Sequence, residues 1–172
     1  HALAGEVLAP ADLLAAPSRI GCAPGSIVLC DQRAAALGIA APLAAAGLDV
    51  RDACDPGLAR EDAARAVAGI SGCAALVAET GGALLLHGHG EDRLASLLPP
   101  VHVLIATADQ VAATLDAALA LRDAAGSPSA TIVAGPSRTA DIEKRLVLGM
   151  HGPGRVVLVL VPGPAAAPDT RE

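Results

Sequence analysis

Short apolar runs recur at fairly even intervals along the 172-residue chain, and most of them are separated by segments with apolar residues at helical spacing. The runs are almost continuously apolar, as is typical of strands that are covered on both faces of a sheet. This alternation predicts a three-layer α/β fold with a largely parallel sheet. The predicted strands are Ser26–Cys30, Cys73–Ala78, Ala83–His87, Val101–Ala106, Ala130–Ala134 and Arg155–Val161, and the predicted helices are Ala34–Ala46, Arg60–Ala68, Ala108–Ala124 and Thr139–Leu148.

One pair of strands departs from this alternation. Only the four residues "ETGG" (Glu79–Gly82) separate two of the runs, and two of the four are glycines. A connection this short predicts a hairpin turn and not a crossover helix, so we expect the sheet to be mixed at this point. The length of the chain fits a single domain spanning residues 1–172.

Polar residues crowd into the segment "GPSRTADIE" (Gly135–Glu143), directly after a predicted strand. A helix start explains two of them, because Thr139 can cap the helix and the helix dipole favours Asp141 in the first turn. The dipole disfavours Arg138 at the same place. Backbone N–H groups together with this guanidinium and the Ser137 hydroxyl would instead bind a carboxylate or phosphate.

The turn at Glu79, Thr80 and Gly81 follows another predicted strand. Ligands of open α/β sheets bind beyond the carboxyl ends of the strands. If the two strands are neighbours, this turn and the segment at Gly135 face one another across a crevice. Glycines in turns are ordinary, but Glu79 at such a place can pair with Arg138, act as a base or serve as a nucleophile.

The histidines differ in the sites that they suggest. His87 and His89 are two residues apart and would share one face of a strand, but two ligands are only half of a metal site, so we predict no metal. His102 lies within an apolar run, as a core histidine would. His151 lies among glycines that let the backbone approach a ligand closely, and it is a binding candidate.

Composition narrows the function further. The chain has a formal net charge of −6 and no Phe, Tyr or Trp, which argues against nucleic-acid binding. The longest uncharged stretch, Ala34 to Leu48, is too short to span a bilayer and contains Pro42. Because no signal-peptide pattern is visible, we expect a cytoplasmic protein.

The cysteines predict no cofactor. No two of them have the close spacing that zinc ribbons and iron–sulfur clusters need, so we expect small buried thiols of a cytosolic protein. They are Cys22, Cys30, Cys54 and Cys73.

Several strings together resemble a known family. "GPSRTADIE" followed by "LVLGMHGP", and upstream "AETGGALLL" and "LASLLPPVHVLIA", are similar to segments of the lactate utilization protein C family, whose members carry a lactate utilization (LUD) domain. The resemblance implies a fold similar to the ribose-phosphate isomerase, glucosamine-phosphate deaminase and coenzyme A transferase group. It also implies a part in the oxidation of L-lactate to pyruvate, with iron–sulfur partner proteins that carry the electrons.

Three functions stay open at this point: a non-redox component of a lactate-oxidising system that binds a small anion, a free-standing isomerase or acyl- or coenzyme A-transferase, and a regulatory ligand sensor. In the second, Glu79 is the base or nucleophile. The expected substrate-binding residues are Thr80, Gly81, Gly135, Ser137, Arg138, Thr139, Asp141 and His151.

Overall fold

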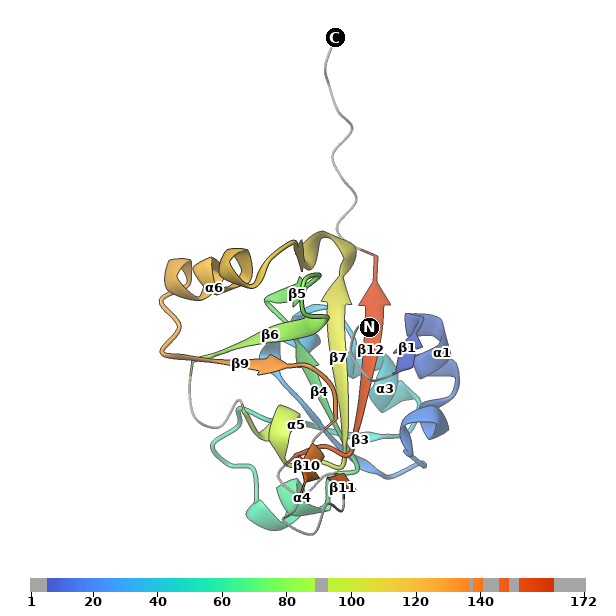
Figure 1. The fold of residues 1–172 in the computed structure, drawn as a ribbon. Coiled ribbons are helices and arrows are strands. Elements are labelled where there is room, and N and C mark those ends of the chain that lie inside the picture. Colours follow the sequence, from blue (N-terminus) through green and yellow to red (C-terminus); the bar gives the residue numbers. More distant parts are fainter. Residues whose placement is uncertain (1–5, 89–92, 137, 141–145, 149–151, 163–172) are drawn as a thin grey trace.

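The main sheet is six-stranded, and all of its neighbouring strands run parallel (Figure 1). The computed structural model describes residues 6–88, 93–136, 138–140, 146–148 and 152–162. The order across the sheet is β1 (Glu6–Leu8), β12 (Arg155–Val161), β7 (Val101–Thr107), β4 (Ala68–Gly72), β2 (Ile27–Cys30) and β3 (Asp49–Asp52). The predicted α/β class with a largely parallel sheet is confirmed.

A second sheet packs on one face of the first, and its strands run across those of the main sheet (Figure 1). Its order is β8 (Val111–Ala112), β5 (Ala75–Val77), β6 (Gly82–His87) and β9 (Ser129–Val133). The predicted hairpin is confirmed, because β5 and β6 pair antiparallel across Glu79–Gly81. The two sheets meet in a layer of buried side chains that includes Leu85 of β6 and Leu104 of β7.

Short helices cover the remaining faces. On the opposite face of the main sheet, Leu13 of α1 and Leu43 of α3 are completely buried against strand residues. Gly69 of β4 lies so close to α5 that a Cβ on it would stand 1.7 Å from the carbonyl oxygen of Ala95. The helices are α1 (Pro10–Ala15), the 3-10 helix η1 (Pro17–Ile20), α2 (Gln32–Ala36), α3 (Ala40–Ala45), α4 (Arg60–Arg65), α5 (Leu94–Leu97), the 3-10 helix η3 (Ala108–Gln110) and α6 (Leu115–Ala124). No helix in these described ranges is long and apolar enough to cross a membrane.

Three predicted helices are shorter than expected. The segment Ala34–Ala46 is divided between α2 and α3 by Gly38, whose φ is +76°. The segment Arg60–Ala68 stops at Arg65, because Ala68 already belongs to β4. In Ala108–Ala124 the first residues form η3 and β8, and α6 begins only after Thr114, whose hydroxyl accepts a hydrogen bond from Ala117 N at 3.2 Å.

The predicted helix at Thr139–Leu148 is wrong at both of its described ends. Strand β10 (Arg138–Ala140) pairs antiparallel with β11 (Leu146–Leu148), and Thr139 lies opposite Val147. Both are β-branched residue types, which are enriched in strands and depleted in helices. The intervening Asp141, which was predicted in the first turn of that helix, lies outside the described residues.

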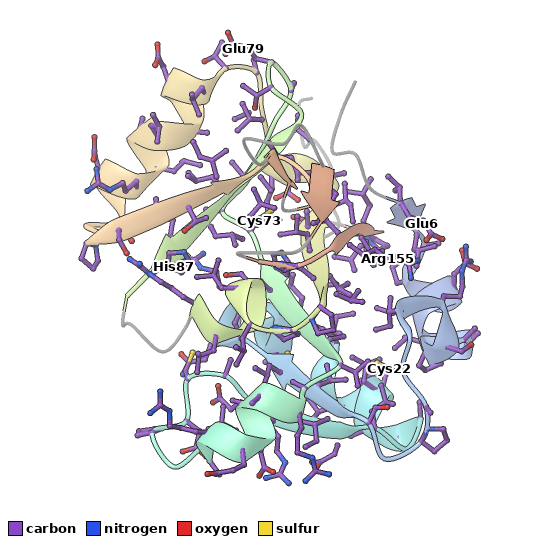
Figure 2. All side chains as sticks on the ribbon, turned by 60° about the horizontal axis from the view of Figure 1, so that its bottom comes forward. Glu6, Cys22, Cys73, Glu79, His87 and Arg155 are labelled. Carbon is purple, nitrogen blue, oxygen red and sulfur yellow. The ribbon has the colours of Figure 1, made fainter. Side chains whose placement is uncertain are left out.

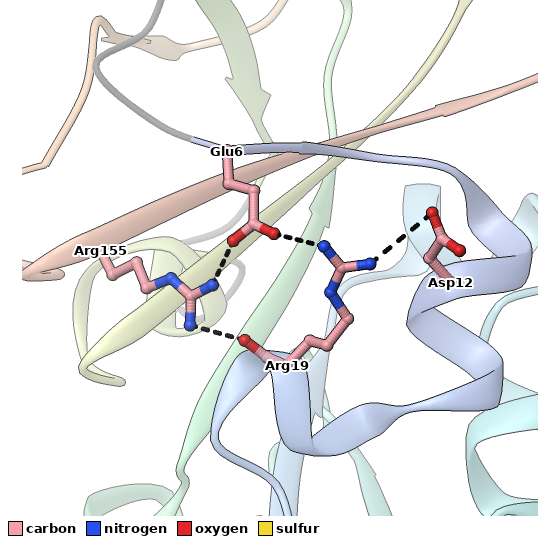
Figure 3. Close-up of polar contacts among 4 residues, drawn as sticks. All are labelled: Glu6, Asp12, Arg19 and Arg155. Atoms are coloured by element: carbon pink, nitrogen blue, oxygen red, sulfur yellow. Dashed lines mark hydrogen bonds and ion pairs between the residues drawn. The ribbon is translucent and has the colours of Figure 1, made fainter.

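A small ionic network fastens the edge strand β1 to its surroundings (Figure 3). The Glu6 carboxylate accepts a hydrogen bond from Arg19 Nη2 at 2.8 Å and a second one from Arg155. Arg155 also donates to the carbonyl oxygen of Arg19 at 2.6 Å, and Arg19 lies 3.7 Å from Asp12. The hydrogen bond from Arg155, followed by that from Arg19, lowers the pKa of Glu6 below its ordinary value of 4.5.

Replacing Glu6 by Gln should lower stability at neutral pH but not in acid. The folded carboxylate binds a proton less readily than the unfolded one, so its contribution is present above the ordinary pKa and is lost as pH falls through the lowered pKa. Urea denaturation of both proteins at pH 7 and at about pH 3 measures this difference. A difference that is the same at both pH values would contradict the role of the charge.

His102 of β7 is the core histidine that the sequence predicts, but it lacks the partners that such a residue usually has. It is 0% exposed, and neither of its ring nitrogens has a hydrogen-bond partner within the described part of the chain. Burial lowers the pKa of His102 to about 4, from an ordinary value of 6.5. The imidazole is therefore neutral in the folded protein at pH 7.

The buried imidazole should make the fold sensitive to acid. The unfolded chain takes up a proton at His102 near pH 6.5 and the folded chain only near pH 4, so stability should fall between these values, by roughly 3 kcal/mol. His102→Leu, which cannot be protonated, should lose that much less over the same range in urea denaturation. Equal losses in both proteins would show that other groups cause the acid sensitivity.

Candidate functional site

Strand β2 lies between β3 and β4, and the chain leaves β2 for β3 on one side before it crosses to β4 on the other. Such a reversal of strand order opens a crevice at the carboxyl ends of the strands, where ligands of open α/β sheets bind. Asp31 follows β2, and Ser71 lies near the end of β4. The topology therefore directs attention to these two residues.

Asp31 joins the two strand ends. Its Oδ1 accepts hydrogen bonds from Ala34 N at 2.8 Å and from Gly72 N at 3.0 Å, and its own N–H donates to the carbonyl oxygen of Ile70 at 2.9 Å. The first of these bonds caps α2, and the other two belong to the end of β4. One carboxylate thus fixes a helix start against the neighbouring strand.

Gly72 allows α2 to approach β4 closely. A Cβ on Gly72 would lie 2.6 Å from the Cβ of Arg33, which is closer than real Cβ atoms come to their neighbours. The approach places Arg33 beside the end of β4. Its side chain is exposed, and it forms no ion pair with any residue in the described ranges.

A cavity of about 460 Å³ opens at this edge. Ser71 lies in its wall, 1% exposed, and its hydroxyl oxygen has no hydrogen-bond partner among the residues described. A buried hydroxyl without a partner is uncommon and calls for an explanation, such as a ligand. The cavity is lined by Asp31, Gln32, Arg33, Ala36, Cys54, Ser71, Leu85, Leu86, His87 and Gly88.

The second sheet also contributes to this cavity, through His87. His87 ends β6, is 4% exposed, and its Nε2 lies 2.9 Å from Thr131 Oγ1 on β9. A smaller cavity of about 180 Å³ adjoins it, between His87 and the loop at 125–128. His89, the other member of the histidine pair, lies outside the described residues, and within the described ranges no three His, Cys, Asp or Glu side chains form a group that could hold a metal.

Two buried cysteines near the site, Cys30 and Cys73, are held as thiols. Burial, followed by the charges of Asp31 and Asp52, raises the pKa of Cys30 to about 12. Burial also raises the pKa of Cys73 to about 11. Cys54 is more exposed than these two and lines the cavity. It can therefore report chemically on whether the cavity is occupied.

Glu79 lies at the other end of β6 from His87 (Figure 2). Its exposed carboxylate accepts a hydrogen bond from Leu115 N at 3.0 Å, at the start of α6, and its own N–H donates to Ala113 O at 3.1 Å. In the same turn, Thr80 Oγ1 accepts from Gly82 N at 3.2 Å, and Gly81 has a φ of +66°. Through these hydrogen bonds Glu79 caps the start of α6, and Thr80 stabilises the turn.

The segment at Gly135 does lie at the same edge as this turn. Strands β5 and β9 point the same way with β6 between them, and Ala83 pairs with Val133. Arg138 and Thr139 are in β10, so the helix N-terminus that was expected to help them bind an anion is not there. The predicted binding residues Ser137, Asp141 and His151 lie outside the described residues.

Sequence reasoning therefore missed the residues of the cavity. The signal was the polar triplet Asp31-Gln32-Arg33, which follows the apolar strand "SIVLC" directly. The strand β4 that carries Ser71 was not predicted, so the reversal of strand order could not be seen. Ser71 and Arg33 come together only because β4 inserts between β2 and β7.

Comparison with known proteins identifies relatives. Lactate utilization protein C of Deinococcus radiodurans is 38% identical over 129 residues, which cover 72% of this chain and 59% of that protein. The protein of the same name from Exiguobacterium sp. is 38% identical over 133 residues, or 70% and 55% of the two chains. The chain thus spans a little over half the length of these curated relatives.

A solved structure and a family model agree with this. The crystal structure of a DUF162 family protein from Deinococcus radiodurans matches with a TM-score of 0.59 and 26% identity, over 92% of this chain and 87% of that one. The sequence model of the LUD domain matches residues 6–161, which include every strand of both sheets. The chain therefore belongs to the LUD domain family.

Proposed function

We propose that this chain is a component of lactate utilization that binds a small organic anion in the cavity beside Arg33. The names of its relatives support the process, since both relatives described above are called lactate utilization protein C. In this proposal L-lactate is oxidised to pyruvate in the cytoplasm, and iron–sulfur partner proteins take up the electrons. The chain itself contributes binding.

One observation carries the proposed site. At the reversal of strand order, one cavity is lined both by Arg33, which is exposed and forms no ion pair in the described part of the chain, and by Ser71, whose buried hydroxyl has no hydrogen-bond partner there. A carboxylate or phosphate would satisfy both, with charge-assisted hydrogen bonds from Arg33 and an ordinary one from Ser71. Among the residues that the structure describes, neither group has a hydrogen-bonding or ionic partner that would explain its position.

The contacts of Glu79 and Arg138 give less support to the alternative site at these two residues. Glu79 is engaged as the cap of α6, and Arg138 is in a strand. An enzyme that uses Glu79 as base or nucleophile predicts that Glu79→Gln abolishes growth on lactate. The cavity proposal predicts that Arg33→Gln does so, while Glu79→Gln, whose amide oxygen can still cap the helix, does not.

Arg33→Gln should weaken anion binding about ten- to a hundredfold, because a charge-assisted hydrogen bond contributes about 1.5–3 kcal/mol. Stability should change by less than about 0.5 kcal/mol, since the side chain is exposed. The rate at which iodoacetamide alkylates Cys54, measured with increasing phosphate or lactate, reports the affinity. Arg60→Gln, an exposed arginine of α4 away from the cavity, is the control and should bind like the wild type.

Ser71→Ala should leave stability unchanged or slightly raised, because no hydrogen bond in the described structure is lost. The same variant should bind the anion more weakly. Ser96→Ala is the matched control: Ser96 is equally buried, but its hydroxyl donates to Arg93 O at 3.0 Å, so its loss should cost about 1 kcal/mol. If urea denaturation shows the same loss for both variants, Ser71 has a structural partner and not a ligand.

A further inference from the structure

The inner face of strand β6 ends in an imidazole. Alternate residues of a strand point to the same side, and the row of Ala83, Leu85 and His87 points toward the main sheet, because the first two belong to the buried layer between the sheets. The row is apolar up to His87, which is only 4% exposed. A buried polar ring costs free energy unless it is bonded, so His87 is the informative exception in this row.

His87 is held in place from strand β9. Its carbonyl oxygen accepts a hydrogen bond from Ser127 Oγ at 2.9 Å, and it lies opposite Ser129 in the ladder between β6 and β9. The ring is anchored as well, since Nε2 lies 2.9 Å from Thr131 Oγ1. A threonine hydroxyl can accept a hydrogen bond from both the neutral and the protonated imidazole, so this anchor is compatible with either charge state.

His87 and Arg33 share a wall in both cavities. Each of the two residues lines the larger cavity and also the smaller one. An anion that is bound at Arg33 therefore has the imidazole in the same wall, whichever of the two cavities the anion occupies. The position of His87 relative to the proposed ligand thus does not depend on how the cavities are joined.

The ionisable groups around His87 come from several elements. Asp31 and Arg33 stand at the start of α2, and Cys54 follows β3. Arg93, which precedes α5, donates a hydrogen bond to the serine that lies opposite His87 on β9. In the described part of the chain, the imidazole is therefore surrounded by two guanidinium groups, one carboxylate and one thiol.

This balance of charges couples a proton on His87 to the anion. In the absence of an anion, the two guanidinium groups oppose a further positive charge, and the Asp31 carboxylate already accepts two backbone hydrogen bonds at Oδ1. A carboxylate or phosphate at Arg33 adds negative charge to the same wall and favours the protonated ring. The protonated ring in turn has two N–H donors, where the neutral ring has one.

We infer that the anion and a proton bind to this site together, and that His87 is the group that takes up the proton. The imidazolium is then a second cationic ligand of the anion, beside Arg33. The inference rests on the proposed function, since it names a further binding residue of the same site. Because the bound state holds more protons than the unbound state, affinity should rise as the pH falls through the range in which histidines titrate, from about pH 8 to about pH 5.

Isothermal titration calorimetry of the whole chain tests this coupling. Lactate and sulfate are the probes, because neither changes its charge between about pH 8 and about pH 5.5. The affinity for each should rise with falling pH, by as much as about tenfold per pH unit, which is the limit for one coupled proton. Titrations at one pH in two buffers of different ionisation enthalpy should show the uptake of up to about one proton for each anion bound.

Two histidine variants assign the proton. His87→Gln keeps a side chain that can bond to Thr131 but cannot be protonated, so at every pH it should bind as weakly as the wild type does at about pH 8, without proton uptake. His102→Leu is the matched control, because His102 lines neither cavity and its pKa of about 4 keeps it neutral over this range. This control should keep the full pH dependence, and Arg33→Gln should weaken binding at both ends of the range.

A measurement on the wild type covers the case in which His87→Gln does not fold. The protonation of the His87 ring is followed by NMR as a function of pH, with and without sulfate. The midpoint of this titration should move to higher pH when sulfate is bound, since the anion favours the protonated ring. A midpoint that sulfate leaves unchanged would overturn the inference.

The outcomes separate this inference from the proposed function. If the anions bind and depend on Arg33, but affinity is the same at all pH values and no proton is taken up, the inference is wrong and the proposed site stands. If His87→Gln keeps the pH dependence, or loses binding equally at both ends of the range, His87 does not take up the proton and the inference is wrong as well. If neither probe binds at any pH, the proposed site itself is wrong.

Discussion

A single carboxylate oxygen, Oδ1 of Asp31, fixes the geometry on which the site depends. It accepts one hydrogen bond from the start of α2 and another from the end of β4, so the helix and the strand cannot move independently. Gly72 makes this possible, since a side chain there would collide with Arg33. These contacts fix the backbone of Arg33 at the wall of the cavity, and its side chain forms no ion pair with the residues that the structure describes.

The packing of small side chains explains why α2 lies so close to the end of β4. With no aromatic residues, the core consists of Leu, Val, Ile, Ala and Cys, and its elements must approach closely to exclude water. Gly69 against Ala95 is the clearest instance, because the backbone of α5 occupies the place of a side chain. Strand β4 therefore carries small residues on the side where helices and the second sheet press against it.

The small side chains of the core also determine how much of the fold could be predicted from the sequence. All six predicted strands exist, because each is a continuous apolar run. Strands β3, "DVRD", and β4, "AGISG", were missed, since the first is a polar edge strand and the second is made of small residues. Because β4 was not predicted, the reversal of strand order could not be predicted either. For the same reason, Ser71 and Arg33 could not be recognised as parts of one site. The turn at Glu79 was predicted correctly as a turn, but no local pattern could reveal that its carboxylate caps a helix 36 residues away.

The pairing of β1 with β12 has a consequence for the way in which the chain is made. Among the strands that the structure describes, β1 neighbours only β12, and Glu6 lies opposite Val157, about 150 residues later. At usual rates of synthesis, the ribosome needs roughly 8–30 s to make that length. During this time β1 has no strand to join, and the edge of β7 that β12 will cover is open. The growing chain thus exposes unpaired backbone at both places until nearly the whole domain has emerged, and unpaired strand edges of this kind favour aggregation during folding.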